Sequence, residues 1–403
     1  MNNHTDIPLS LAEVDGPFLT SALREAGVLQ KGEVVDIHTR VIGQGAGFMG
    51  EVVDLRLTLS EESPDVPTQL ILKIPTASRN RRIGQTLGIY EREIRFYREL
   101  QPRLGIRTPR HLYSAMDLST DPHHTLKALK WVNRMPIWLI RPALPLLGWL
   151  GRRKTNRYIL IIENLGGYRV GDQVAGCSIE DAKVALKAMA RMHAQFWNSG
   201  ELTTLPWLVP IELIPKPIHM MFLKTLNDFK IHHEGWLTND HITVLNWLKL
   251  HFIDLVKHIS LRPHTLLHGD FRLDNLCFDD TRGEIILFDW QTLGTGPIGS
   301  DLAYFLSSSM SIDTNQNTMA ELIEYYRHQL ADNDVSITPE ALQWEYETGL
   351  LTVLHRTVPA QFQNILDFGD GRGNDLIDTW IQRVFSKLSH VDPNRLLEKI
   401  PRS

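Results

Sequence analysis

The segment from His268 to Asn275 and the carboxylate of Asp289 carry the residue types and spacing from which a chemistry can be inferred. Asp270 is followed by the amide Asn275 five positions later, and Asp289 comes fourteen positions after that. Apolar residues flank all three, so we expect them to project from strand ends and a tight loop into one cleft. An acid, an amide and an acid that converge there suit phosphoryl transfer from ATP and magnesium.

Separate roles follow for the three side chains. We expect Asp270 to be the general base, and Asn275 and Asp289 to hold Mg²⁺. The run Glu284–Asp289 predicts a strand that delivers a carboxylate at its C-terminal end. The alternative is a hairpin whose Asp residues cap turns, as Asp279 is expected to do. Residue identities, spacing and context together favour the catalytic interpretation.

Lys73 is a second candidate, because it lies within the otherwise apolar strand Gln69–Ile74. Burying an ammonium group without a partner is costly, so a carboxylate or a phosphate should meet it. Glu93 is the expected partner, since it shares the inward face of the following helix with Phe96, and Glu91 is the competitor. The alternative is an edge-strand lysine that points to water.

A glycine-rich segment between two expected strands supplies the third candidate site, at Gly43, Gly45 and Gly47. Glycines allow a tight turn and let backbone N–H groups approach phosphate oxygens. Taken alone the segment is weak evidence, because many such loops simply turn the chain. No helix is expected to follow it, so the dinucleotide-fold and P-loop explanations do not apply.

The secondary-structure elements that must position these residues fall into two regions, which differ in their predicted secondary structure. Strand patterns dominate up to residue 163, and the nearly all-apolar run Tyr158–Ile162 should be a central strand. Beyond Gly166 the pattern is mostly helical. We therefore expect an α+β fold with two lobes, a small β-rich lobe at 1–163 and a larger helical lobe at 164–403. The predicted elements are a helix within 8–30, strands at 34–42, 51–59, 69–74, 109–117 and 157–164, and helices at 84–100 and 181–197.

Composition excludes several other classes of protein. The chain has 403 residues, 43% of them hydrophobic, which is ordinary for a globular protein with a substantial core. A net charge of −5 without a dominant basic block gives no reason to expect nucleic-acid binding. Cys177 and Cys277 lack metal spacing, and the polar start lacks a signal-peptide pattern, so a cytoplasmic location is the default.

The motif His268-Gly269-Asp270 with Asn275, followed by Asp289-Trp290, resembles the aminoglycoside phosphotransferase and choline-kinase-like branch of the protein-kinase-like fold. Further matching segments are Glu93–Tyr97, His193–Trp197 and Gly296–Phe305, so most of the chain outside 118–156 is covered. The chain is also similar to the ecdysteroid-kinase-like proteins and to members associated with acyl-CoA dehydrogenases.

This resemblance implies roles for residues of the N-terminal lobe. Gly43, Gly45 and Gly47 would cover the triphosphate of ATP. Lys73 would contact its α- and β-phosphate oxygens and be oriented by Glu93. The segment Glu163-Asn164-Leu165 would form the interlobe hinge, whose backbone groups meet adenine.

In the C-terminal lobe the resemblance implies that Asp270 orients and deprotonates the acceptor hydroxyl. His268 and Asp301 are expected to have structural roles. Asp301 would either cap the N-terminus of a helix or form a hydrogen bond that holds the catalytic loop. Arg272 lies where a cation could stabilise the transferring phosphoryl group, and a salt bridge to Asp274 is the alternative.

The expected function is an ATP- and Mg²⁺-dependent phosphotransferase that acts on a hydroxyl of a small molecule. A pseudokinase scaffold is one alternative, and an aminoglycoside kinase is another. Few acidic residues accompany the expected acceptor contacts, which favours a lipophilic or hydroxyacyl-type acceptor over a polycationic one. These contacts are expected at Tyr304, Trp344, Tyr346, His355, Arg356 and Asp367.

An insertion at 118–156 separates two of the expected strands. Its apolar stretch is interrupted by prolines and is too short to span a bilayer, but tryptophans and flanking cations at 131–154 suit an interfacial segment. We expect a helical flap that contacts a membrane peripherally or covers a lipophilic acceptor. The alternatives are extra packing against the N-terminal lobe or a dimer contact.

Overall fold

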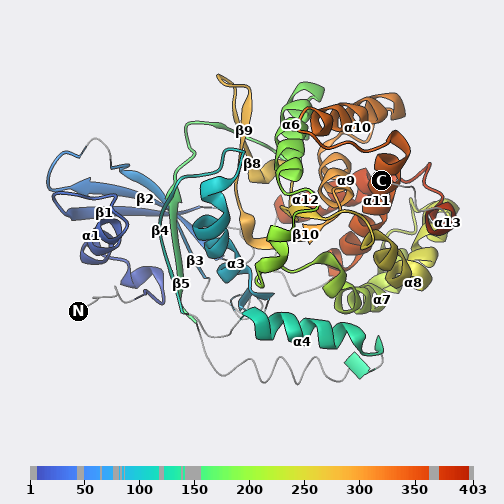
Figure 1. Cartoon of the computed structure of the whole chain (residues 1–403), viewed down its shortest axis with the longest axis horizontal. Helices are drawn as coiled ribbons and strands as arrows, with labels where there is room; N and C mark the ends of the chain where they lie inside the picture. Colours follow the sequence, from blue (N-terminus) through green and yellow to red (C-terminus); the bar gives the residue numbers. More distant parts are fainter. Residues whose placement is uncertain are drawn as a thin grey trace.

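A five-stranded antiparallel sheet forms the N-terminal part of the computed structural model (Figure 1). The structure describes residues 7–42, 50–63, 66–75, 81, 84–85, 87–117, 122–137, 139–140, 156–362 and 372–398. The strand order is β1-β2-β3-β5-β4. The strands are β1 (Val34–Ile42), β2 (Gly50–Leu59), β3 (Gln69–Pro75), β4 (His111–Met116) and β5 (Tyr158–Glu163).

Strand β5 is apolar from Tyr158 to Ile162, where both of its faces are buried. Ile159 and Ile161 belong to a core cluster with α1 (Gly16–Glu25), whereas Tyr158 and Leu160 belong to the main core with α3 (Ile89–Arg95). The two helices lie on opposite sides of the sheet in Figure 1. The prediction of a central strand is confirmed, since β5 pairs with both β3 and β4.

The C-terminal part is mainly helical and carries two small sheets. The first sheet has the order β6-β8-β9, and the second pairs β7 with β10. These strands are β6 (Arg169–Val170), β7 (Thr265–Leu267), β8 (Leu276–Asp279), β9 (Glu284–Leu287) and β10 (Gly294–Gly296). The helices are α6 (Ile179–Gln195), α7 (Pro215–His232), α8 (Asn239–Ile259), α9 (Gly299–Ser309), α10 (Gln316–Ala331), α11 (Pro339–Phe362), α12 (Arg372–Ser386) and α13 (Pro393–Glu398). The expected α+β architecture is thereby confirmed.

Helices α9 and α11 approach each other closely at two glycines. A Cβ atom on Gly299 would lie 2.1 Å from the carbonyl oxygen of Glu345, and one on Gly349 would lie 2.2 Å from the carbonyl oxygen of Gly299. The absence of side chains is therefore what permits this crossing. It fixes the distance between the helix that carries Tyr304 and the helix that carries Arg356.

Two predicted helices differ in extent from the observed ones. The N-terminal helix is limited to α1, which begins after Asp15, whose side chain accepts a hydrogen bond from Phe18 N. The helix expected at 84–100 is regular only over α3, and Phe96–Leu100 continues it with wider π-type turns. Its inward face is as predicted, since Glu93 and Phe96 are both buried.

The insertion at 118–156 contains the helix α4 (Pro122–Arg134), and 118–121 and 141–155 lie outside the described residues. Asn133 Nδ2 donates to the carbonyl oxygen of Glu212 at 2.8 Å, and Lys216 Nζ donates to the carbonyl oxygen of Met135 at 2.7 Å. Helix α4 is thus tied to the C-terminal part rather than to the N-terminal sheet. In the described part of the chain, no helix is long and apolar enough to cross a membrane.

Candidate active site

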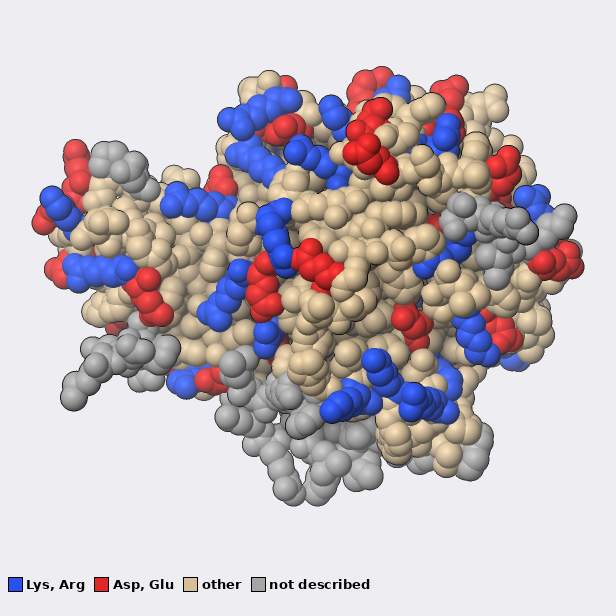
Figure 2. Space-filling view, viewed as in Figure 1, with Lys and Arg blue, Asp and Glu red and all other residues tan. Residues whose placement is uncertain are grey.

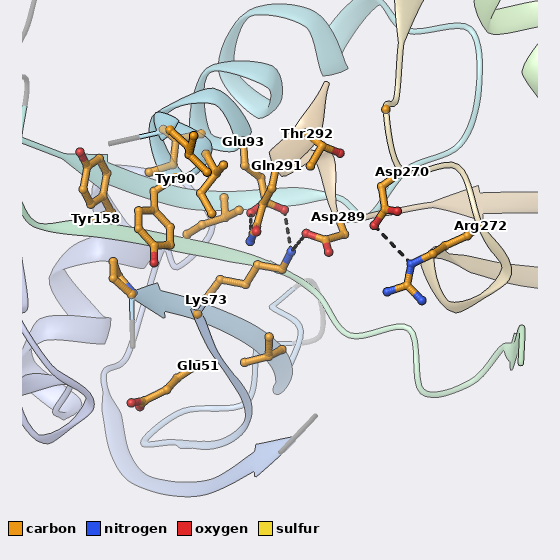
Figure 3. A pocket seen from close by; sticks show the side chains of 18 of the residues that line it. Glu51, Lys73, Tyr90, Glu93, Tyr158, Asp270, Arg272, Asp289, Gln291 and Thr292 are labelled. Atoms are coloured by element: carbon orange, nitrogen blue, oxygen red, sulfur yellow. Dashed lines mark hydrogen bonds and ion pairs between the residues drawn. The ribbon is translucent and has the colours of Figure 1, made fainter. Parts of the chain in front are cut away.

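A cavity of about 360 Å³ lies between the N-terminal sheet and the C-terminal helices. It brings together five of the residues that the sequence predicts, namely Lys73, Glu93, Asp270, Arg272 and Asp289. Figure 3 shows Lys73 reaching from its strand toward Glu93 and Asp289, with Asp270 and Arg272 beyond Asp289. Residues far apart in the chain thus share one site.

Lys73 is held between two carboxylates. Its Nζ lies 2.6 Å from Glu93 Oε1 and 3.0 Å from Asp289 Oδ1. Burial lowers the pKa of the Lys73 ammonium, but the charges of Asp289 and Glu93 outweigh burial and raise it above its ordinary value. The competitor Glu91 pairs instead with Arg95 at 2.8 Å. The structure therefore selects Glu93 as the partner and excludes the solvent-facing alternative.

Asp289 follows strand β9 and adopts a left-handed backbone conformation, with φ at 64°. The N–H of Phe288 donates to the carbonyl oxygen of Asn275 at 3.1 Å, which ties the two expected metal ligands together through the backbone. Trp290 stacks on Phe96 with ring centroids 3.8 Å apart. These contacts hold the residues on both sides of Asp289, and the bond to Lys73 orients its carboxylate.

Asp270 receives hydrogen bonds on both of its carboxylate oxygens. Tyr304 Oη donates to Oδ1 at 2.5 Å, while Asn275 Nδ2 at 2.9 Å and Arg272 Nε at 3.3 Å donate to Oδ2. Burial raises the pKa of the Asp270 carboxyl, but the Arg272 charge, the Tyr304 hydrogen bond and the Arg356 charge outweigh burial and keep it below its ordinary value. The carboxylate is therefore ionised and fixed in orientation.

Asp301 holds the backbone of the loop that carries Asp270. Its two carboxylate oxygens accept the N–H groups of His268 at 2.7 Å and Gly269 at 2.9 Å. Gly269 has φ at 78°, and a Cβ atom there would lie 2.4 Å from the carbonyl oxygen of Thr292. Of the two expected roles for Asp301, the structure supports the bond that holds the loop. Glycine is required at 269 by both conformation and space.

Two oxygen atoms are available for a divalent cation. Asn275 uses its amide N–H₂ toward Asp270, and Asp289 uses Oδ1 toward Lys73, so Asn275 Oδ1 and Asp289 Oδ2 accept no hydrogen bond from the described residues. Carboxylate and amide oxygens are the donors that magnesium prefers. Among the described residues no group of three His, Cys, Asp or Glu side chains could hold a metal ion. Magnesium held by one or two protein groups plus substrate phosphates fits this donor set.

Other predicted site residues lie away from this cavity. Glu163 and Leu165 do not line it, because β5 runs antiparallel to β3 and Glu163 pairs with Leu70 rather than with Lys73. Their expected contact with adenine stays a prediction. Gly43, Gly45 and Gly47 lie outside the described residues.

The expected acceptor contacts divide into two groups. Tyr304 and Arg356 line the cavity, and Asp367 lies outside the described residues. The prediction was wrong for Trp344, Tyr346 and His355, which are buried in the helical core and do not line the cavity. These side chains are part of the helical core instead. Trp344 Nε1 donates to the carbonyl oxygen of Leu396 at 3.0 Å, and the ring of His355 stacks on Phe252.

Sequence reasoning missed two residues that support the site. Gln291 Nε2 donates to Glu93 Oε2 at 3.2 Å, and its place directly after Asp289-Trp290 was the available signal. Gln173 accepts the N–H of Leu273 at 2.8 Å and donates its own N–H to Asp274 at 2.9 Å. No pattern in the sequence indicates that this irregular segment bonds to the loop that carries Asp270.

Comparison with known proteins gives one family and a set of distant structures. The model of the ecdysteroid kinase-like family matches residues 44–196 and 220–337, which is most of the chain. No protein with a curated description matches it.

The solved structures have low identity and moderate TM-scores. A choline/ethanolamine kinase family protein from Mesorhizobium loti is 14% identical, with 90% of this chain and 91% of that chain covered and a TM-score of 0.47. A choline kinase from Cryptosporidium parvum Iowa II is 10% identical, with 87% and 90% covered and a TM-score of 0.46. An amicoumacin kinase in complex with AMP-PNP and Ca²⁺ is 14% identical, with 96% and 98% covered and a TM-score of 0.42.

Proposed function

The chain belongs to the ecdysteroid kinase-like family, and we propose that it transfers the γ-phosphoryl group of ATP to a hydroxyl group of a small molecule. One observation carries this proposal. The ionised Asp270, hydrogen-bonded on both of its carboxylate oxygens, lines the same cavity as the Lys73–Asp289 ion pair. A proton acceptor and a phosphate-binding cation beside a free metal-binding oxygen are the parts that phosphoryl transfer needs.

The residues of the site have separate roles in this reaction. Asp270 orients the acceptor hydroxyl and takes its proton as the oxygen–phosphorus bond forms and the bond from γ-phosphorus to the bridging oxygen breaks. Lys73 contacts the phosphates of the nucleotide. Asn275 and Asp289 hold Mg²⁺, which when bound neutralises charge on the phosphates. The glycines at 43, 45 and 47 and the hinge residues Glu163 and Leu165 complete the proposed nucleotide site.

Arg272 has a positioning role in the proposed reaction, because it holds the loop that carries Asp270. It donates to Asp270 at 3.3 Å and to Asp274 at 2.7 Å, so its charge is shared between two carboxylates of the catalytic loop. This supports the salt-bridge interpretation. Catalysis by electrostatic stabilisation of the phosphoryl group would require Arg272 to leave one of these partners.

The acceptor end of the cavity supports a lipophilic substrate. Its walls include the apolar side chains of Ala360, Leu376, Ile377 and Trp380. Asp270 is the acidic residue at this end among the described lining residues, whereas a polycationic aminoglycoside would require several. A pseudokinase scaffold is disfavoured because Lys73, Glu93, Asp270, Asn275 and Asp289 are all present.

ADP release over a panel of alcohols, with ATP and Mg²⁺, tests this function. Asp270→Asn should lower kcat by about 100-fold or more, since general-base catalysis contributes on that order. ADP should still bind to the variant, as measured by its thermal stabilisation. Nucleotide binding without turnover of any alcohol would favour the scaffold instead.

We also propose that helix α4 contacts an anionic lipid surface. His123, Lys127, Lys130, Trp131 and Arg134 follow helical spacing along one exposed stripe, and the exposed fraction of Trp131 is 60%. Lys and Arg side chains gather over α4 at the lower edge of Figure 2. Cations beside tryptophan suit an interfacial contact.

Co-sedimentation with vesicles that contain phosphatidylserine tests this contact. Lys127→Glu combined with Lys130→Glu should abolish binding, and Lys224→Glu combined with Lys249→Glu, at exposed positions of α7 and α8, is the control with the same change of charge. Equal binding to neutral vesicles, or binding that the double variant retains, would contradict the proposal.

A further inference from the structure

Arg356 differs from the other cations that line the cavity. Lys73 pairs with Glu93 and Asp289, and Arg272 pairs with Asp270 and Asp274. Within the described part of the chain, Arg356 forms no salt bridge. Its guanidinium instead lies over the ring of Tyr304, with Cζ 4.3 Å from the centroid, and its Nη1 donates to the carbonyl oxygen of Gly269 at 3.0 Å.

Among the described residues, the guanidinium of Arg356 therefore has N–H donors without an acceptor. It carries five N–H groups, and one of its nitrogen atoms has a hydrogen-bond acceptor among the described residues. The cavity lining also includes Ala360, one helical turn later on α11, the α12 residues Leu376, Ile377 and Trp380, and Asp270, whose pKa the charge of Arg356 helps to lower. A cation in such surroundings favours a bound anion, and a guanidinium suits carboxylates and phosphates in particular.

The position of Arg356 also relates this anion to the reacting hydroxyl. Tyr304 donates to Asp270 through Oη and supports Arg356 on its ring face. Asp270 thus lies at the hydroxyl end of this tyrosine and the guanidinium lies over its ring face, so that one side chain contacts both groups. A ligand that contacts both must carry its hydroxyl and its anionic group a few bonds apart, with its apolar part toward Trp380.

We propose that the acceptor is an amphipathic hydroxy compound whose anionic group, a carboxylate or a phosphate, binds Arg356 while its hydroxyl meets Asp270. This inference rests on the proposed phosphotransferase function and names the substrate class. Arg356 is then a specificity-determining residue. It selects against neutral alcohols and against cationic ones, for which its charge is unfavourable.

Paired ligands provide the test. Hydroxy acids of medium chain length, with the hydroxyl two to four bonds from the carboxylate, are compared with their methyl esters and with the matching diol monophosphates. Binding is measured through tryptophan fluorescence in the presence of a nonhydrolysable ATP analogue and Mg²⁺, and turnover is measured by ADP release. The acid or the monophosphate should bind at least roughly tenfold more tightly than the ester, because a charge-assisted pair is worth that much or more.

Variants separate recognition from structural support. Arg356→Gln should weaken binding of the anion by roughly 10- to 100-fold and leave the ester nearly unchanged. Arg356→Lys retains the charge and keeps the test usable if the Gln variant folds poorly. Arg327→Gln is the control, since Arg327 pairs with Glu324 on α10 away from the cavity.

The outcomes are distinct. Tighter binding of esters than of acids and monophosphates, or equal losses for both in Arg356→Gln, would overturn the inference and leave the phosphotransferase proposal standing. Selective anion binding without ADP release would support the inference about the ligand and contradict the proposed catalysis. A preference for the acid or for the monophosphate identifies which anion the site takes.

Discussion

Tyr304 donates a hydrogen bond of 2.5 Å to Oδ1 of Asp270, and the described residues supply no other donor to that oxygen. The phenol thus occupies a hydrogen-bonding position on the carboxylate that an acceptor hydroxyl would also seek. Because Oδ2 already accepts from Asn275 and Arg272, the acceptor must share Oδ1 with Tyr304 or displace it. In the proposed reaction, Tyr304 is therefore a positioning residue for the carboxylate oxygen that would accept the proton.

Tyr304→Phe should move the acid limb of the pH–rate profile. The Tyr304 hydrogen bond helps to lower the pKa of Asp270, so its loss raises that pKa, and the base becomes protonated at a higher pH. We expect the acid limb of kcat/KM to shift upward by roughly one pH unit, because a hydrogen bond to a charged group is worth about 1.5–3 kcal/mol. Tyr325→Phe on α10 is the control. A uniform loss of activity at every pH would indicate a purely structural role.

Gly269→Ala should destabilise the protein more than a change at a comparable glycine. Both Gly269 and Gly283 have positive φ, but a Cβ atom on Gly269 would meet Thr292, whereas at Gly283 nothing lies within 4 Å. The left-handed conformation costs about 1–2 kcal/mol for a residue with a Cβ. Chemical denaturation should show that cost for Gly283→Ala and a larger loss for Gly269→Ala. Equal losses would contradict the close approach at Thr292.

Asp301→Asn should reduce the dependence of stability on acid pH. Burial raises the pKa of Asp301, but its bonds and charges with His193, His268 and Gly269 outweigh burial and keep it below the ordinary value of 3.8. A depressed carboxyl pKa stabilises the folded state above the unfolded value, and this contribution is lost as the pH falls through the folded value. At neutral pH we expect the variant to lose about 2–3 kcal/mol, since one strong N–H acceptor is replaced.

Thermal unfolding between pH 3 and pH 7 measures this effect. The difference between the native protein and Asp301→Asn should shrink as the pH falls below about 4. Asp332→Asn, an exposed substitution after α10, is the control. A difference that stays constant with pH would show that the charge of Asp301 does not contribute.

Asp289→Asn should raise the Mg²⁺ concentration needed for half-maximal activity. The amide loses the negative charge that attracts the cation, and we expect a change of about tenfold or more. Asp334→Asn is matched in backbone, since its φ of 63° is close to the 64° of Asp289, and Asn tolerates this conformation. An unchanged Mg²⁺ requirement would remove Asp289 from the metal site.

The sequence predicted the ionic residues of the site better than its walls. Lys73 and Glu93 could be paired because strand and helix periodicities both turn them inward. Asp270, Asn275 and Asp289 had informative spacing. The sequence pattern does not show which face of α11 lines the cavity, because this helix is apolar around most of its circumference. It buries Trp344 and His355 on other sides.

The loop partners were unpredictable for a different reason. Gln173 reaches Asp274 across 101 positions from a segment without regular structure, and hydrogen bonds of this kind leave no periodic trace in the sequence. Arg356 was predicted as an acceptor contact, but whether it forms a salt bridge depends on the whole cavity, and among the described residues it forms none. The partners of a side chain become clear only in the folded structure, where elements that are distant in the sequence come together.

The glycine crossing of α9 and α11 sets the spacing of the two side chains that the proposed acceptor would contact. Tyr304 lies five residues beyond Gly299 and Arg356 seven beyond Gly349, which is about 7 and 10 Å along the two helix axes. A small tilt at the crossing is magnified over those lengths and changes the gap between phenol and guanidinium. With the acceptor bound as proposed, a change at these two backbone contacts would therefore alter substrate preference without replacing any side chain that touches the substrate.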